Sequence, residues 1–167
     1  MFSIVMWLMI FTSLVVIYAF RFELNFVKDR VLAVLVPSYS WSNTPGQVVI
    51  ARGSDGHFYL DAKNKNKYQI KFLVDTGATD VALTQEDAVK FGIDPKKLNY
   101  TQRYSTANGV AYAAPVVIDQ LTIGQKTFYN IDGHVTSGGL DVSLLGMSVI
   151  NKFRDFSITR DLLTLNY

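Results

Sequence analysis

The chain has 167 residues, and its 16 Lys and Arg against 14 Asp and Glu leave a formal net charge of +2. So small a surplus gives no basic field of the kind that binds a phosphate backbone, and we expect no nucleic-acid partner. The absence of cysteine excludes disulfides, a thiolate nucleophile and a zinc site built on sulfur. The length allows one domain of ordinary size and an additional segment.

The first 20 residues carry no charged side chain. As a helix they would extend about 30 Å, the thickness of the hydrocarbon core of a bilayer. We therefore predict an uncleaved transmembrane helix at residues 1–20 and a single-pass membrane localisation. A cleaved signal peptide is less favoured, because no Lys or Arg precedes the apolar run and the run exceeds the usual core of about 7–15 residues. Arg21, Lys28 and Arg30 follow it, and taken alone they place the rest of the chain in the cytoplasm.

Residues 21–45 are predicted to be a juxtamembrane linker, and residues 46–167 to be the folded domain. In this domain, short runs of branched and aromatic residues alternate with turn residues. The predicted strands comprise residues 47–52, 57–62, 68–74, 104–107, 110–118, 121–123, 128–135, 156–159 and 162–166. One short helix follows the capping pair Thr84 and Asp87 and stops at Gly92, and a second covers residues 148–153. The pattern predicts an all-β fold, a small closed barrel with one or two short helices.

One carboxylate occupies a distinctive place. Residues 72–79, FLVDTGAT, put Asp75 on a tight turn with Gly77 directly after an apolar strand, and the chain contains this turn once. Acid-base chemistry on a peptide bond would require a second carboxylate close by, so that one is ionised while the other holds a proton. Since no other Asp or Glu sits in a comparable turn, the partner is expected to be Asp75 of a second copy of the chain.

Two further segments belong with this turn. Leu144, Leu145 and Gly146 form an apolar pair that closes on a glycine, as is needed where a strand passes close behind another backbone. Asn108 and Gly109 lie between two strand-like runs and give the strongest short hairpin signal. A hairpin of this kind can cover a cleft and exclude water.

In this order, the three segments resemble the catalytic turn, the flap and the hydrophobic-hydrophobic-Gly element of retropepsin-type aspartic proteases. The likeness is greatest to the membrane-anchored bacterial branch of that family, which includes the rickettsial retropepsin-like enzyme. It extends from about Tyr18 to the C-terminus. The segments that resemble family motifs are residues 55–58, 74–79, 106–109 and 143–147. Four ordered segments at family spacing are far more specific than Asp-Thr-Gly alone.

The resemblance implies a homodimeric aspartic endopeptidase that cleaves proteins or peptides without a cofactor or a metal. Two Asp75 carboxylates would hold a water, one as general base and the other as general acid, with no covalent intermediate and with activity favoured at acidic pH. It also implies that the protease domain is periplasmic or extracytoplasmic in a bacterium. The implied catalytic residues are Asp75, Thr76 and Gly77; the substrate-binding residues are Ala78, Thr79, Thr106, Ala107, Asn108, Gly109 and Val110; the supporting residues are Leu144, Leu145 and Gly146.

In the family, the threonine at Thr76 donates its hydroxyl across the dimer axis, the glycine at Gly77 lets backbone approach the carboxylate, and Thr79 stands where a side chain can bond the outer carboxylate oxygen. The chain departs from retroviral members in having one glycine at the hairpin tip and Met147 in place of a charged residue. These departures concern hairpin mobility and dimer strength.

Other interpretations of the same residues remain. A domain of this fold could be a non-catalytic module that dimerises or grips extended peptides by strand addition. His57 and His134 are isolated histidines without a metal-ligand motif and are interpreted as structural. Tyr104 and Tyr112 flank the predicted hairpin, where they either touch substrate or pack as strand aromatics.

Overall fold

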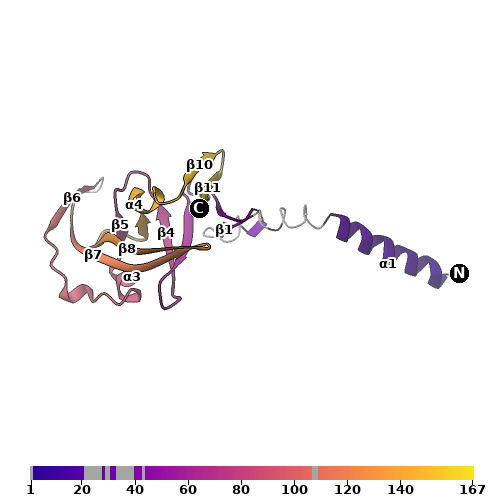
Figure 1. The fold of residues 1–167 in the computed structure, drawn as a ribbon, viewed down its shortest axis with the longest axis horizontal. Coiled ribbons are helices and arrows are strands. Elements are labelled where there is room, and N and C mark those ends of the chain that lie inside the picture. The colour runs from indigo at the N-terminus through magenta and orange to yellow at the C-terminus, as the bar shows by residue number, and fades with distance from the viewer. Residues whose placement is uncertain (1, 21–27, 29–30, 33–39, 43, 107–108) are drawn as a thin grey trace.

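The computed structural model describes residues 2–20, 28, 31–32, 40–42, 44–106 and 109–167, and its strands form two sheets (Figure 1). The smaller sheet is antiparallel with the order β1-β2-β11-β10. Its members are β1 (Ser40–Trp41), β2 (Gln47–Ala51), β10 (Asp155–Thr159) and β11 (Leu162–Asn166). Both edges of β11 are therefore occupied, whereas β10 lies at the end of the sheet.

The larger sheet has seven strands in the order β3-β4-β9-β5-β8-β7-β6. They are β3 (Tyr59–Lys63), β4 (Gln69–Val74), β5 (Val81–Leu83), β6 (Gln102–Thr106), β7 (Gly109–Ile123), β8 (Lys126–Thr136) and β9 (Ser143–Leu145). Two pairs, β4 with β9 and β5 with β8, are parallel. Strands β3 and β7 also pair over two residues, so strands distant in the sheet order meet.

Branched and aromatic side chains from both sheets form the main core, and Trp41 and Val49 form a small second cluster. The largest fully buried side chains of the main core are Phe72, Ile50, Leu60, Ile70, Leu83, Ile118, Leu121, Ile123, Ile131, Leu145, Ile150 and Leu163. Strand β4 illustrates the pattern, because Ile70 and Phe72 are fully buried while Gln69 and Lys71 are exposed. This alternation with a period of two residues places one face of β4 on the core.

Most strands confirm the sequence prediction, with ends shifted by at most two residues. Strand β7 is continuous, however, where the sequence predicts a break between 118 and 121. The ladder pairs Ile118 with Ile131 and Gln120 with Tyr129, and between these pairs Asn130 has a φ of 48°. A local irregularity therefore carries the polar Asp119 without ending the strand. Strands β5 and β9 went unpredicted as strands, because three residues are too few to show alternation.

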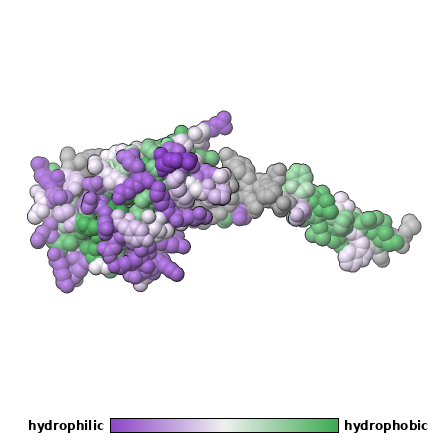
Figure 2. All heavy atoms as spheres, in the orientation of Figure 1, coloured by the Kyte–Doolittle hydropathy of each residue, from purple (hydrophilic) through white to green (hydrophobic). Residues whose placement is uncertain are grey.

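Helix α1 (Phe2–Ala19) requires a correction. Its side chains from residue 4 onward are exposed, and Figure 2 shows hydrophobic residues along it, in contrast to the mostly hydrophilic surface over the sheets. Among the residues that the structure describes, however, no helix combines the length and the apolar character that crossing a membrane requires. The predicted single-pass membrane localisation is therefore wrong.

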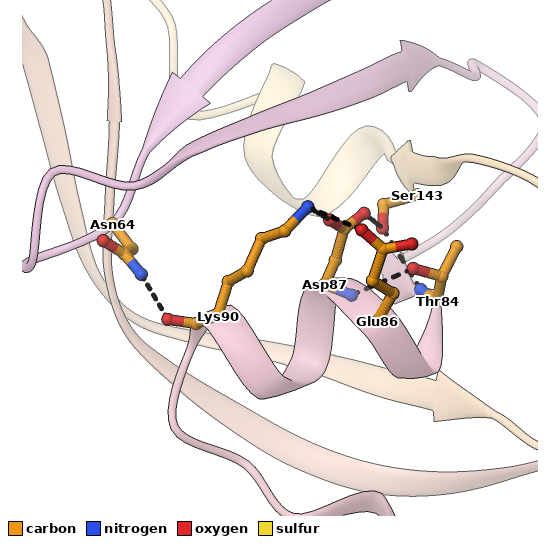
Figure 3. Close-up of polar contacts among 6 residues, drawn as sticks. All are labelled: Asn64, Thr84, Glu86, Asp87, Lys90 and Ser143. Carbon is orange, nitrogen blue, oxygen red and sulfur yellow. Dashed lines mark hydrogen bonds and ion pairs between the residues drawn. The ribbon is translucent and has the colours of Figure 1, made fainter.

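Helix α3 (Gln85–Lys90) is fastened to β9 by the carboxylate of Asp87, whose side chain is 11% exposed (Figure 3). Its Oδ2 accepts a hydrogen bond from the Ser143 hydroxyl at 2.6 Å, and its Oδ1 accepts one from the Lys90 ammonium at 2.8 Å. This bond to Asp87 raises the pKa of Lys90, which burial opposes. The Ser143 hydroxyl in turn accepts from the Thr84 N–H at 3.1 Å. A buried charge is thus paired and hydrogen-bonded, as its burial demands.

The ends of α3 are also satisfied. Thr84 is the N-cap, as the sequence predicts, and its hydroxyl accepts from the Asp87 N–H at 3.1 Å. At the other end, the Asn64 amide donates to the Lys90 carbonyl at 2.5 Å (Figure 3). The remaining helices are short: η1 (Pro95–Lys97) and α4 (Met147–Ile150), the latter ending earlier than the predicted 148–153. Helix α3 therefore links the β3–β4 turn to β9.

Replacing Ser143 by alanine tests this link. Ser143→Ala removes one donor from the buried Asp87 carboxylate, and we expect the free energy of unfolding to fall by about 1–3 kcal/mol in urea denaturation. Ser148→Ala is the matched control, because the buried Ser148 hydroxyl has no hydrogen-bond partner in the described part of the chain and its loss should change little. Equal effects of the two substitutions would contradict the link.

Candidate active site

Strand β4 ends at Val74, and the turn that follows holds the half-buried Asp75. The Asp75 N–H donates to the Leu145 carbonyl at 3.1 Å, and the Asp75 carbonyl accepts from the Ala78 N–H at 3.2 Å. The Gly77 N–H donates to Asp75 Oδ1 at 2.8 Å. Backbone groups on both sides of the carboxylate therefore fix its position.

The residues beside Asp75 differ in their contacts. A Cβ on Gly77 would lie 3.2 Å from Asp75 Oδ1, tighter than an ordinary contact, so glycine leaves the carboxylate room. Thr76 and Thr79 are exposed on the turn. Within the described residues, the Thr79 hydroxyl makes no hydrogen bond to Asp75, in contrast to what the resemblance allows.

The apolar pair that closes on Gly146 lies directly behind this turn. Strand β9 runs parallel to β4 and pairs Leu144 with Leu73 and Leu145 with Val74. A Cβ on Gly146 would lie 2.7 Å from the Ala78 carbonyl oxygen and closer still to that of Asp80. The first N–H groups after Gly146, those of Met147 and Ser148, donate to the Ala78 and Thr79 carbonyls at 2.9 and 2.8 Å. Glycine is therefore the residue that lets the two backbones approach.

A hairpin stands near the turn. Strands β6 and β7 pair antiparallel, and their last pair is Thr106 with Gly109. Strand β7 thus begins at Gly109, one position earlier than a turn centred on Asn108 and Gly109 would allow. Ala107 and Asn108 lie outside the described residues, and Val110 is exposed.

Between the turn and the hairpin is a cavity of about 290 Å³. Its lining residues come from the turn, β5, the hairpin, β8, β9 and the segment before β9: Gly77, Ala78, Thr79, Asp80, Ala82, Tyr104, Ala111, Ala113, His134, Thr136, Gly138, Gly139, Leu140 and Leu144. Of the sequence-predicted site residues, this set contains Gly77, Ala78, Thr79 and Leu144. The structure therefore brings Gly77 of the Asp-Thr-Gly turn and Leu144 of the apolar pair to one groove, whereas Asp75 and Leu145 are not among its lining residues.

Sequence reasoning missed a cluster on the wall of this groove. The rings of Tyr104 and His134 stack with centroids 4.5 Å apart and planes at 18°. Burial lowers the pKa of His134, and the charge of Asp80 opposes this shift. Burial also raises the pKa of Tyr104, and Asp80 adds to it. The sequence placed Tyr104 beside the predicted hairpin and suggested that His134 is structural, but no pattern in it indicated that the two rings meet.

The chemistry that this arrangement offers is that of a carboxylate. Within the described residues, no three His, Asp or Glu side chains are grouped so that they could hold a metal ion. One oriented carboxylate beside a groove can act as a general acid or base, but not as both at once.

The sequence and the fold were compared with those of known proteins. Residues 62–152, more than half of the 167, match the family described as gag-polyprotein putative aspartyl protease. The chain belongs to this family. Among solved structures it is similar to a retropepsin-like aspartic protease from Rickettsia conorii, with a TM-score of 0.66 and 51% identity over 77% of this chain and 97% of that one. The fold is therefore retropepsin-like and mostly β, and the predicted resemblance to retropepsin-type aspartic proteases is confirmed.

Two further relatives cover nearly the whole chain. An uncharacterised protein of Rickettsia prowazekii (strain Madrid E) is 52% identical over 166 residues, which span 99% of this chain and 71% of that protein. An uncharacterised protein from the region 5′ of cobV in Sinorhizobium sp. is 42% identical over 168 aligned positions, covering 98% of this chain and 72% of that protein. The similarity thus extends beyond the family match at residues 62–152.

Replacing Gly146 by alanine tests the close approach behind the turn. The new Cβ would meet two backbone carbonyls rather than flexible side chains, so the Asp75 turn or α4 must shift. We expect Gly146→Ala to lower the free energy of unfolding by about 1–3 kcal/mol, measured by urea denaturation. If the midpoint and slope of the denaturation curve do not change, the two backbones have enough space for a Cβ at residue 146, and the prediction is wrong.

Proposed function

We propose that the chain is an aspartic endopeptidase, active as a homodimer in which each copy contributes Asp75. The observation that supports this most strongly is the position of Asp75: a half-buried carboxylate, fixed by backbone hydrogen bonds, on a turn that lines a groove. The family is one of aspartyl proteases, and a single oriented carboxylate per chain leaves the second to come from another copy.

In the proposed reaction, the two Asp75 carboxylates share one proton, because like charges so close cannot both be ionised. The ionised carboxylate takes a proton from a water, which attacks the peptide carbonyl, while the protonated one donates to the carbonyl oxygen. The tetrahedral species then collapses with proton transfer to the leaving amine. No covalent bond to the protein forms.

We assign the remaining roles as follows. Thr76 hydrogen-bonds across the dimer axis, and Gly77 leaves space for the Asp75 carboxylate. Peptide binding falls to Ala78, Thr79, Thr106, Ala107, Asn108, Gly109 and Val110, and backbone support to Leu144, Leu145 and Gly146. We also retain the small closed barrel, which the pairing of β3 with β7 supports. The protease domain comprises residues 46–167, and the preceding linker of residues 21–45 supplies β1.

For the dimer contact we propose the free edge of β10. The C-terminal strand β11 cannot pair with a second copy, because β2 and β10 occupy both its edges. All five residues of β10 are exposed, and Phe156 and Ile158 present apolar side chains there. Antiparallel pairing of two β10 strands would satisfy the unpaired backbone groups of both edges.

Substitution of Asp75 tests the activity. We expect Asp75→Asn in the full chain to lower the cleavage rate of a peptide library by at least about 10²–10⁴-fold between about pH 4 and 7, because the amide can neither take nor give the proton. Asp132→Asn is the control, since Asp132 is exposed on β8 and should leave cleavage unchanged. Undiminished cleavage by Asp75→Asn would refute the mechanism. Peptide binding without cleavage by the wild-type chain would favour the non-catalytic peptide-binding module.

Charge at β10 tests the dimer. We expect Ile158→Glu to weaken self-association at least about fivefold, since like charges would oppose each other across the paired edges. Sedimentation velocity over a range of concentrations measures the change. Val117→Glu is the control, because Val117 is an equally exposed branched residue on β7 of the other sheet. Equal association of both variants would place the contact elsewhere.

A further inference from the structure

The ring stack on the groove wall joins two strands that are not neighbours. Tyr104 belongs to β6 and His134 to β8, and β7 lies between them in the sheet order. Along β7, Tyr104 pairs with Ala111 and His134 with Pro115, positions four residues apart. The two rings therefore meet diagonally across β7, and their contact fixes β6 relative to β8 beyond what the hydrogen-bond ladder does.

This contact bears directly on the groove. Both rings line the 290 Å³ cavity, together with Asp80 from the turn after Asp75. The Tyr104 hydroxyl donates to Gln102 Oε1 at 2.8 Å, a bond within β6, so the ring is anchored to its own strand. Separation of the two rings would free β6 to move away from β8 and would widen the cavity.

His134 is suited to only one protonation state while it is stacked. Its Nδ1 is buried and has no hydrogen-bond partner in the described part of the chain. The residues that pair with it, Ala82 on β5 and Pro115 on β7, carry no charge, and Tyr104 offers an aromatic face. Asp80 is the charged group that acts on the ring, and the effect of burial exceeds it, since the pKa of His134 is lowered overall.

Protonation would therefore change the balance between stacked and separated rings. It would give Nδ1 a hydrogen without an acceptor and would place a charge in a poorly hydrated site. An imidazolium is better hydrated once β6 has moved away. Because the stacked ring binds a proton less readily than a free histidine, with its ordinary pKa of about 6.5, release of β6 begins as the pH falls below that value.

We propose that Tyr104 and His134 are positioning residues whose ring stack holds β6 over the groove, and that protonation of His134 releases β6 to admit a peptide. That the ligand is a peptide rests on the proposed function, whereas the release of β6 by protonation does not. The direction of the change agrees with the acidic conditions that a carboxylate pair requires, so entry and hydrolysis would be favoured together.

Nuclear magnetic resonance of the full chain tests the release. The Tyr104 ring current should displace the His134 Hε1 resonance upfield at about pH 7.5, and the displacement should vanish with a midpoint below about 6.5. His57, the other histidine of the chain, is exposed and gives a reference resonance. Tyr104→Phe should keep the displacement and Tyr104→Leu should abolish it. A displacement that persists in the protonated ring would overturn the proposal.

A binding measurement tests the consequence for the groove. With Asp75→Asn present to prevent cleavage, a peptide selected from the cleavage library should associate about two- to tenfold faster at about pH 5 than at pH 7.5, the range expected from loss of one aromatic pair. Adding His134→Phe, which keeps a ring but cannot be protonated, should remove this difference, and a persistent difference would refute the role of His134. If the wild-type chain cleaves no peptide, the proposed function fails while the resonance test still decides the release.

Discussion

The close passage of two backbones at Gly146 is the constraint on which the rest of the site depends. The Asp75 turn has its shape because its carbonyls at Ala78 and Thr79 accept the N–H groups that follow Gly146. Those groups can reach the turn only if no Cβ intervenes. Strand β9 must then run parallel to β4, and α3 holds β9 in place through the buried pair of Asp87 and Ser143. A chain of contacts thus extends from α3, through the sequence-distant strand β9, to the carboxylate.

The same arrangement separates what stabilises the fold from what completes the site. Core packing, the Asp87 network and the turn hydrogen bonds all lie within one chain. The second carboxylate of the proposed mechanism does not. A folded single chain is therefore expected to be catalytically incomplete. It already contains the groove wall formed by Tyr104 and His134, but only one of the two carboxylates.

The sequence predicted those features that depend on residues close together in the chain. The turn at Asp75 and the N-cap at Thr84 were readable because glycine, threonine and aspartate at fixed offsets have defined backbone roles. The contact between Tyr104 and His134 was not readable, because it depends on the registers of β6 and β8 along β7, and no local pattern encodes those. Residues 1–20 were misinterpreted because an uncharged run records apolar character but not where a helix ends. Strands β5 and β9 are too short for a period and are defined by their partners.

The open edge of β10 has a consequence for a chain that has not yet formed the proposed dimer. An exposed edge strand with apolar side chains is a template on which other extended segments can pair, and not only the partner proposed above. In a single chain, pairing of β10 with the proposed partner strand therefore competes with aggregation through the same edge. If the proposed dimer forms through β10, the pairing of two such edges protects them from other segments and also brings the two Asp75 carboxylates into one molecule.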